Sequence, residues 1–358
     1  MNYKPRPEKQ TFSYPTGKLP AEDLAKLLIR YTKDDGRLVV KPGIGIDATV
    51  ISFADRYLVA KTDPITFATD QIGWYAVHVN ANDVAVMGGN PRWFLATLLL
   101  PEGKTGPDEV EAIFAQISMA CQQLGVVLCG GHTEITYGLN RPIVVGQMLG
   151  EVERTKLIMP DKARPGDDIL LTKGIAIEGT ALIARERGEL RKHFGENWVK
   201  RCQNLLRAPG ISVVPEARIA NGVAEVHAMH DPTEGGLATA LHELASAARV
   251  GMIVEMGKII ILPETALLCQ HLKLEPLGLI ASGALLIVAP EGDSIKIIGA
   301  LQAEGIPAAV IGKVWESGKG VKLRHQGEVD DLPFFRRDEV ARLFGGVADE
   351  HFPYSLQE

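Results

Sequence analysis

Acidic and amide residues recur beside glycines in this 358-residue chain, between segments that have the pattern of buried strands and helices. Carboxylates at the ends of buried elements are costly unless they meet a cation or hydrogen-bond donors. Mg²⁺ takes few protein carboxylates and completes its shell with water and phosphate oxygens, which suits acidic residues on separate loops. The sequence therefore predicts a site for magnesium and a nucleotide. The segments concerned are Gly45-Ile46-Asp47-Ala48, Lys61-Thr62-Asp63, Asn80-Ala81-Asn82-Asp83 and Cys129-Gly130-Gly131-His132-Thr133-Glu134.

Length and composition indicate a globular protein with more than one domain. The chain exceeds the usual size of a single core, and 46% hydrophobic and 23% charged residues are ordinary values. The formal net charge is −6 without a long basic block, which argues against nucleic acid as a partner. No apolar run matches a signal peptide or a membrane span. Four scattered cysteines without a Cys-x-x-Cys pair predict reduced thiols in a cytoplasmic protein.

Proline, glycine and clustered charge suggest how the chain divides. The segment 159–168 contains two prolines and a glycine and is the best candidate for a domain junction. We expect a leader over residues 1–17, a first domain over 18–160, a second domain over 166–325 and a charged tail over 326–358. Strand and helix patterns mix in both domains, which predicts the α/β (α+β) fold class.

Two helices of the first domain follow from pattern alone. The apolar stripe from Val110 to Leu124 stops at Gly125, as a helix does at a C-terminal glycine. Residues 71–87 contain no proline and also have a helical pattern, on which Asn80 and Asp83 share a face.

The polar residues of the first half also have ordinary structural explanations. Gly45 lies in a Gly-x-Gly segment that is typical of a turn, and Asp63, before a proline, is typical of a cap at a strand end. Asp83 lies among valines, so its carboxylate needs a partner, and either Mg²⁺ or a hydrogen-bonded loop satisfies this need. Asn82 faces another side of the same helix and can bind phosphate oxygens or metal-bound water.

The segment Gly130-Gly131-His132-Thr133 follows a predicted strand, and we expect a loop there. The backbone N–H groups of such a loop can approach an anion closely, although a plain β-turn has the same pattern. His132 is a candidate metal ligand or proton donor, or an ordinary hydrogen-bonding residue. Glu134 is a candidate for contact with metal or substrate.

In the second half, Asp231-Pro232-Thr233-Glu234-Gly235-Gly236 is an acidic turn that opens a helix, whose free N–H groups suit phosphate. Asp231 or Thr233 is alternatively the N-cap. Lys173 ends a strand and either meets a phosphate or is solvated. His227 and His230 lie near this turn without a metal-ligand motif. The sequence contains no P-loop, no Gly-x-Ser-x-Gly elbow and no His-Glu-x-x-His.

Together these segments resemble the superfamily of aminoimidazole ribonucleotide synthetase, thiamine-monophosphate kinase, selenophosphate synthetase and the hydrogenase maturation factor HypE. The likeness covers nearly all of residues 18–325, in order, and is closest to HypE. The HypE segments Gly-Asp-Asp-Ala-Ala, Thr-Thr-Asp, Asn-Asp-(three)-Met-Gly, Gly-Asp-Thr and Asp-Pro-Thr-Arg-Gly-Gly-Leu-Ala are echoed by Gly45-Ile46-Asp47-Ala48-Thr49, Lys61-Thr62-Asp63, Asn82-Asp83-Val84-Ala85-Val86-Met87-Gly88, Gly131-His132-Thr133 and Asp231-Pro232-Thr233-Glu234-Gly235-Gly236-Leu237-Ala238.

The resemblance implies a PurM-like two-domain fold, with an N-terminal domain that dimerises through a β-barrel and a C-terminal α/β domain. It places Mg-ATP in a cleft involving both domains. By position, Asp47, Asp63 and Asp83 would hold Mg²⁺, while Asp231 would face the phosphates or a further metal. Asp231 and His132 are the catalytic candidates. The candidate nucleotide contacts are Gly45, Asn82, Gly130, Gly131, Thr133, Lys173, Thr233, Gly235 and Gly236.

The sequence departs from the HypE pattern at three places. Ile46 replaces the first Asp of Gly-Asp-Asp. His132 stands where HypE has Asp, and at this position the sequence is more similar to selenophosphate synthetase. The sequence ends Pro353-Tyr354-Ser355-Leu356-Gln357-Glu358, whereas HypE ends in the cysteine that carries the group converted to a nitrile. The leader also lacks the reactive cysteine and lysine of selenophosphate synthetase. We therefore expect a HypE-like protein of unassigned substrate.

The leading hypothesis is a Mg-ATP-dependent enzyme that phosphorylates an oxygen of a small molecule or carbonyl group. The phosphorylated product is then released, or the activated oxygen is displaced in a dehydration or amidine-forming step. The alternatives are a non-catalytic nucleotide-binding scaffold in metalloenzyme maturation and a small-molecule kinase like thiamine-monophosphate kinase. The expected partners are ATP, an unknown acceptor, a second copy of the chain and a maturation protein.

Overall fold

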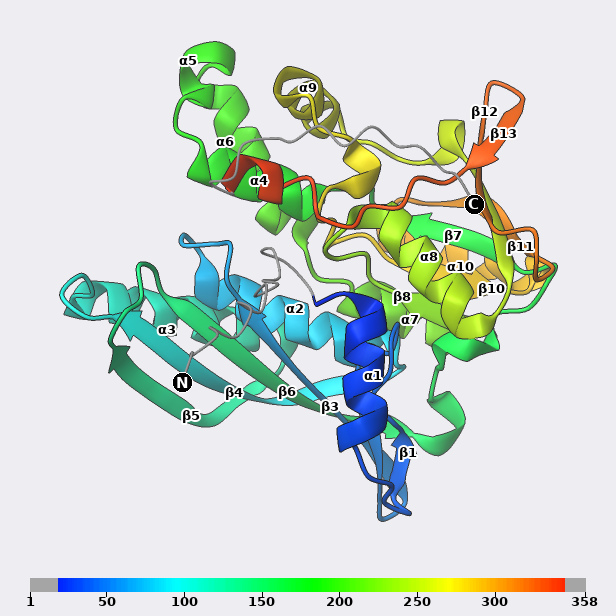
Figure 1. Cartoon of the computed structure of the whole chain (residues 1–358), viewed down its shortest axis with the longest axis horizontal. Coiled ribbons are helices and arrows are strands. Elements are labelled where there is room, and N and C mark those ends of the chain that lie inside the picture. The colour runs from blue at the N-terminus through cyan, green and yellow to red at the C-terminus, as the bar shows by residue number, and fades with distance from the viewer. Residues whose placement is uncertain (1–18, 345–358) are drawn as a thin grey trace, which may run out of the picture.

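The structure, a computed structural model, describes residues 19–344 and contains two mixed domains, each built on one sheet (Figure 1). The predicted leader over residues 1–17 and the chain end at 353–358, which was compared with the HypE terminus, lie outside the described residues.

The first domain contains a six-stranded sheet in the order β1-β2-β3-β6-β4-β5. Neighbouring strands are antiparallel except β4 and β5, and β5 forms one edge of the sheet. Helix α1 (Ala21–Tyr31) precedes the sheet and has no buried residue. The strands are β1 (Leu38–Val40), β2 (Thr49–Phe53), β3 (Arg56–Ile65), β4 (Asn90–Pro101), β5 (Val127–Thr136) and β6 (Ile143–Glu153).

Helix α2 (Ile72–Val86) lies between the first sheet and the second domain (Figure 1), and all of its residues are buried. A helix that is largely apolar around its whole circumference is expected in such a position, and the polar residues of α2 lie at the contact with the second domain or in the candidate site described below. Helix α3 (Pro107–Leu124) packs closely on it at Gly73, where a Cβ would lie 2.6 Å from the Ile113 carbonyl oxygen. The C-terminal residue after α3, Gly125, has a φ of +68°, so the predicted helix stop is confirmed.

The second domain contains a seven-stranded sheet in the order β13-β12-β9-β11-β7-β10-β8, with β12 and β9 as its parallel pair. The edge strand β8 lies against α2. Residues beyond 325, predicted as a tail, continue the sheet as β13. The strands are β7 (Asp168–Thr172), β8 (Ala228–His230), β9 (Gly251–Glu255), β10 (Leu286–Ala289), β11 (Ala308–Trp315), β12 (Val321–His325) and β13 (Glu328–Asp331). The helices are α4 (Ile177–Glu186), α5 (Leu190–Phe194), α6 (Glu196–Asn204), α7 (Val214–Val223), α8 (Gly236–Ala248), α9 (Pro263–Leu272), α10 (Glu291–Ala303) and α11 (Ala341–Phe344).

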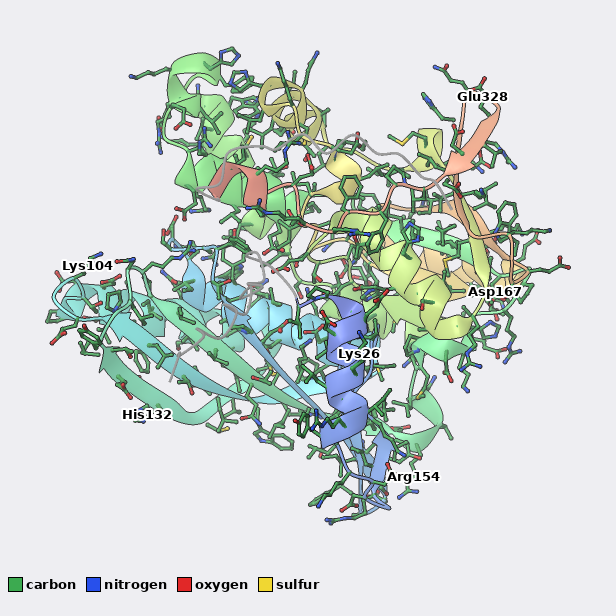
Figure 2. The ribbon with its side chains drawn as sticks, viewed as in Figure 1. Lys26, Lys104, His132, Arg154, Asp167 and Glu328 are labelled. Carbon is green, nitrogen blue, oxygen red and sulfur yellow. The ribbon has the colours of Figure 1, made fainter. Side chains whose placement is uncertain are left out.

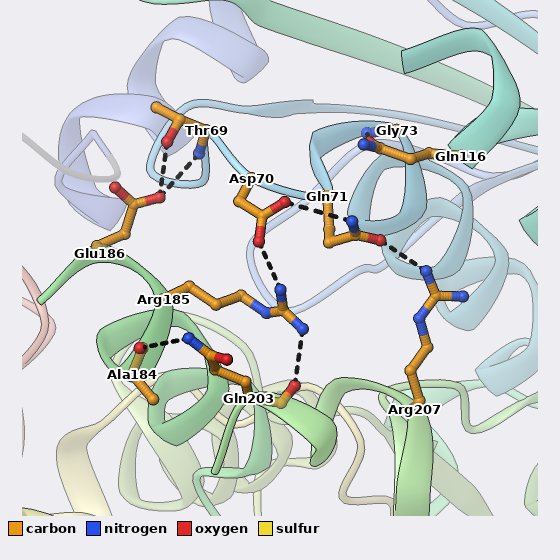
Figure 3. A network of polar contacts seen from close by, with 10 residues as sticks. All are labelled: Thr69, Asp70, Gln71, Gly73, Gln116, Ala184, Arg185, Glu186, Gln203 and Arg207. Atoms are coloured by element: carbon orange, nitrogen blue, oxygen red, sulfur yellow. Dashed lines mark hydrogen bonds and ion pairs between the residues drawn. The ribbon is translucent and has the colours of Figure 1, made fainter. Parts of the chain in front are cut away.

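A polar network ties the loop before α2 to the second domain (Figure 3). Arg185 on α4 donates to the Asp70 carboxylate at 2.5 Å, and Arg207 donates to the Gln71 side-chain oxygen at 2.6 Å. Arg207 also stacks on Trp74, with its guanidinium carbon 3.3 Å from the ring centroid. An exposed ion pair contributes little by itself, and together these contacts link the loop and the first turn of α2 to the second domain.

The predicted mixed two-domain fold is confirmed by the two sheets and their helices. The four cysteines are free thiols; three are buried and Cys129 is exposed, which differs from the expectation of core thiols. Between residues 19 and 344, no helix has the length and apolar character needed to cross a membrane.

Candidate metal and nucleotide site

The four aspartates predicted to hold magnesium come from four elements and meet between the domains. Asp63 lies near the end of β3, Asp83 on α2, Asp47 in the loop before β2, and Asp231 directly after β8. Burial raises the pKa of Asp231 well above its ordinary value, and the nearby carboxylates of Asp83 and Asp47 raise it further. The sequence-based grouping of these residues therefore corresponds to real proximity.

Lys61 supplies a positive charge within this group, which the sequence analysis missed. Its ammonium lies 3.2 Å from Asp83 Oδ2 and 3.6 Å from Asp63 Oδ2. Burial alone would lower the pKa of Lys61, but Asp83, Asp63 and Asp47 outweigh burial and raise it. The sequence contains an indication of this contact, because Lys61 and Asp63 are two residues apart on one strand and therefore lie on the same face.

Asp83 is buried on α2, as predicted from its valine neighbours. Burial raises its pKa to about 7, and the adjacent Lys61 ammonium opposes that shift. Its carboxylate therefore depends on a cation to stay charged at neutral pH.

His230 and Asp231 complete the second half of the group. Nδ1 of His230 lies 3.3 Å from Asp47 Oδ2, and Nε2 lies 2.9 Å from Oε2 of Glu243 on α8. Asp47, His230 and Asp231 each offer one ligand atom, and these atoms lie within 4.8 Å of one another. Asp231 is 1% exposed, and among residues 19–344 neither of its carboxylate oxygens has a hydrogen-bond partner. Unpaired buried carboxylate oxygens fit a bound cation.

Gly45 positions the loop that carries Asp47. Its φ is +73°, and a Cβ there would lie 3.2 Å from the Glu243 carbonyl oxygen. Gly45 thus lets the loop lie against α8, close to the residues that surround His230.

The N-terminus of α8 is already contacted by a carboxylate of the protein, that of Asp338. The N–H of Gly235 donates to Asp338 Oδ2 at 2.6 Å, and Val340 donates to the other oxygen of the same carboxylate at 2.7 Å. Gly236 packs tightly, because a Cβ would lie 2.5 Å from the Leu277 carbonyl oxygen. The Asp338 carboxylate thus occupies part of the position predicted for a phosphate. The sequence analysis could not predict this contact, because Asp338 is far from Gly235 in the sequence.

A cavity of about 330 Å³ lies between the domains beside the aspartates. Glu178 of α4 lines it and is buried, and Ser282 lines it beside Glu178. Burial raises the pKa of Glu178 to about 7, and Ser282 opposes the shift. The other lining residues are Asp63, Pro64, Ile65, Thr66, Phe67, Ala68, Val79, Leu182, Thr233, Glu234 and Ile280. Sequence analysis missed Glu178, although it is the one acidic residue within the apolar run 177–184 of α4.

The loop predicted at Gly130 to Thr133 is wrong, because these residues continue strand β5 in parallel pairing with β4. Gly131 is required by this pairing: its φ is +147°, and a Cβ would lie 1.9 Å from the Ala96 carbonyl oxygen. Gly131 therefore serves close strand packing here, where sequence suggested an anion loop.

His132 lies on the exposed edge of the first sheet, 3.4 Å from Glu134 (Figure 2). The register pairs Asp63 with Gly146, Gly146 with Ala96, and Ala96 with Gly131, so β5 is three strand spacings from Asp63. That separation is about 14 Å. Within one chain, His132 and its neighbours Gly130, Gly131 and Thr133 are thus apart from the aspartates.

Asn82 makes structural contacts between the domains. Its amide nitrogen donates to the Ile211 carbonyl at 2.8 Å, and its oxygen accepts from the Val213 N–H at 2.8 Å. Both polar ends of the buried side chain are occupied, so the structure does not support the predicted contact with phosphate.

Lys173 also contacts the segment around residues 210–216, which Asn82 contacts from the first domain. Its ammonium contacts the carbonyl oxygens of Gly210 and Ser212 at 3.1 and 2.6 Å and Glu216 Oε1 at 2.6 Å. An ammonium has three donors, so none remains for a phosphate. Lys173 is buried, which also differs from the expected solvated lysine.

Comparison with known proteins shows the family to which the chain belongs. The AIR synthase related protein, N-terminal domain, matches residues 45–152, and the C-terminal domain of the same family matches residues 164–324. These matches cover more than half of the chain, which belongs to the AIR synthase related protein family.

Named relatives fit the predicted resemblance to HypE, which is confirmed. A putative hydrogenase expression/formation protein of Methanocaldococcus jannaschii is 30% identical over 294 residues, covering 79% of this chain and 84% of that protein. Carbamoyl dehydratase HypE of Rhizobium leguminosarum bv. viciae is 30% identical over 280 residues, covering 75% and 77%. A structure of hydrogenase maturation protein HypE in complex with ATP has a similar fold, with a TM-score of 0.64, 23% identity and coverage of 91% and 98%.

Proposed function

We propose that this protein binds Mg-ATP between its domains and phosphorylates an oxygen of a small-molecule or carbonyl acceptor, as a HypE-like enzyme. The observation that carries the proposal is Asp231, whose two buried oxygens lack partners and lie beside Asp47 and Asp83. Asp47, Asp63, Asp83 and Asp231 would hold Mg²⁺. The metal supplies neutralisation of phosphate charge, which is the main requirement of phosphoryl transfer. Support also comes from the similar HypE structure with bound ATP and the relatives named carbamoyl dehydratase.

We propose that the acceptor enters the cavity lined by Glu178, Ser282 and Asp63. Glu178 is buried and has a pKa of about 7, and a carboxyl group with such a pKa can donate or accept a proton at neutral pH. Lys61 places a fixed positive charge beside Asp63, at the end of the cavity that faces the aspartates.

We also propose a cytoplasmic homodimer formed at the open edge of β5. An unpaired edge strand with apolar side chains favours pairing with another chain, and β5 exposes Val127 and Ile135 beside Tyr137. Free thiols throughout the chain suit a reducing compartment. A maturation protein is a further proposed partner, since a similar fold was solved as a HypE–HypF complex.

The nucleotide proposal is tested by calorimetric titration with a non-hydrolysable ATP analogue, with and without Mg²⁺. We expect micromolar binding that needs Mg²⁺ and that weakens at least about tenfold in Asp63→Asn, because a metal-binding carboxylate is lost. Asp55→Asn, at an exposed aspartate in the turn between β2 and β3, is the matched control and should bind as the wild type does.

Absence of nucleotide binding under all these conditions would overturn the proposal. Binding without turnover of any acceptor tested would favour the non-catalytic scaffold, and release of a stable phosphorylated product would favour the small-molecule kinase.

Glu178 predicts a distinct pH dependence of stability. Its folded pKa of about 7 exceeds the ordinary value of 4.5, so its contribution to stability is complete below pH 4.5 and is lost as pH rises through 7. The Glu178→Gln side chain cannot ionise. From pH 5 to pH 8, the free energy of unfolding of this variant should therefore rise relative to that of the wild type by on the order of 3 kcal/mol. Urea denaturation at both pH values measures this difference. Glu304→Gln is the exposed control, and parallel pH profiles for Glu178→Gln and wild type would contradict the prediction.

A further inference from the structure

We propose that the cavity of about 330 Å³ between the domains selects an acceptor that carries a cationic nitrogen, such as a protonated amine, on an apolar body. Glu178 is the residue that determines this selectivity. The inference rests on the proposed function for the entry of the acceptor into this cavity, and it deepens that function by naming the chemical class of the acceptor.

The first support is the charge of the cavity wall. Its ionisable side chains are the carboxylates of Asp63, Glu178 and Glu234. Among residues 19–344, no lysine, arginine or histidine lines the cavity. Lys61 lies close to it, but the Lys61 ammonium is already paired with Asp63. A carboxylate or phosphate group of a ligand would therefore meet like charges in this cavity, whereas a cation would be attracted.

The second support comes from the two helices that begin at the cavity. The wall includes Glu178 in the first turn of α4, and Thr233 and Glu234 shortly before α8. A helix N-terminus is a common place for an anionic group of a ligand. Here the protein supplies the negative charge itself, because Glu178 lies at the start of α4 and the N–H of Gly235 donates to Asp338 at 2.6 Å. Neither helix therefore favours an anionic acceptor.

The third support is the position of Glu178 itself. Its side chain lines the cavity, and the residue is 6% exposed. Burial raises the pKa of Glu178, and the negative charges of Asp338 and Glu234 add to this shift, although Ser282 opposes it. The charged form of Glu178 is thus costly in the empty cavity, and a cation that binds beside it would stabilise that form.

The apolar part of the wall favours an organic cation over a metal ion. Ile65, Phe67, Leu182 and Ile280 all line the cavity. Apolar side chains cannot replace the water shell of a metal ion, but they can cover the carbon atoms of a ligand. The aromatic ring of Phe67 adds a group that attracts ammonium. Asp63, a proposed metal-binding residue, lines the same cavity, so an acceptor held there would lie next to the nucleotide.

The test compares three probes that share a phenyl ring and differ in charge: benzylamine, benzyl alcohol and benzoate. Each is titrated into the full chain at pH 8 and constant ionic strength, in EDTA and without nucleotide, so that no metal ion occupies the aspartate site. We expect benzylamine to bind at least about tenfold more tightly than benzyl alcohol, and benzoate to bind more weakly than either. Nuclear Overhauser contacts from the ring protons to labelled methyl groups of Ile65 and Ile280 should place the ring in this cavity.

Variants assign the selectivity to Glu178. Glu178→Gln should reduce the affinity for benzylamine by about tenfold or more, to that for benzyl alcohol, because the carboxylate that pairs with the ammonium is lost. Its affinity for benzyl alcohol should be unchanged, which also shows that the variant is folded. Glu304→Gln, at an exposed glutamate after α10, should bind all three probes as the wild type does.

Several results would overturn the proposal: equal affinity for benzylamine and benzyl alcohol, tightest binding of benzoate, no binding of benzylamine, or binding without contacts to Ile65 and Ile280. Unchanged benzylamine binding in Glu178→Gln would do the same, since another group would then hold the cation. The comparison of probes in the wild type stands even if the variant fails to fold. Because these titrations contain no ATP, failure of the Mg-ATP titration would overturn the proposed function and leave the cation selectivity of the cavity intact.

Discussion

Glu216→Gln is expected to lower the free energy of unfolding by about 3–5 kcal/mol at pH 7, because it leaves a buried lysine without its counter-charge. Glu216 and Lys173 are 2.6 Å apart, and both side chains are almost fully buried. Burial lowers the pKa of Lys173, and Glu216 is the group that opposes this shift. Without the carboxylate, the folded protein would have to bury an unpaired ammonium or release its proton.

The loss of stability in Glu216→Gln should therefore decrease as the pH rises. With a folded pKa below its unfolded value, Lys173 binds fewer protons in the folded state, so stability rises with pH toward the unfolded pKa. The deficit of Glu216→Gln should be smaller at pH 9.5 than at pH 7 in urea denaturation.

Two variants control for this effect. Glu196→Gln breaks exposed ion pairs and should change stability by less than about 1 kcal/mol. The double variant Lys173→Met/Glu216→Met should recover most of the loss, since apolar residues often replace a buried ion pair without cost. A loss below about 1 kcal/mol in Glu216→Gln at pH 7 would contradict the prediction.

The part of the site that sequence analysis could predict depends on local pattern. Asp63 ends an apolar strand, Asp231 precedes a helix with two glycines, and Asp83 lies on a helix among valines. Each position is determined by its own element, and ends of strands and helices are where ligand sites commonly gather. The resemblance to HypE then placed them in one cleft, and the structure brings them together.

The residues that were missed or misassigned depend on tertiary partners. Lys173 has the pattern of a strand-end lysine, and only the packing of the distant Glu216 shows that it is buried. Gly131 is typical of a turn, yet the parallel partner β4 makes it a strand residue that contacts Ala96. Asp338 reaches Gly235 across 103 positions in the chain. Local propensity cannot show such contacts, because tertiary packing overrides it.

Lys61→Met is expected to make stability depend on divalent metal. Lys61 is the positive charge closest to Asp83 and Asp63, at 3.2 and 3.6 Å. Removing one partner of a buried ion pair typically costs about 3–5 kcal/mol, and here Asp83 would remain buried beside Asp47 and Asp63. The melting temperature in EDTA should therefore fall by on the order of 10 °C, at about 2–4 °C per kcal/mol for domains of about 150–250 residues.

Added Mg²⁺ should then recover much of this loss, because a dication can replace the ammonium between Asp63 and Asp83 and stabilises only the folded state. The wild type, which carries its own cation there, should gain less from the same addition. Lys26→Met, an exposed change on α1, should behave as wild type with and without metal. Relieving the repulsion with a second change, Asp83→Asn, should reduce both the loss in EDTA and the gain from Mg²⁺. Equal melting of Lys61→Met and wild type in EDTA would show that Lys61 does not compensate these carboxylates.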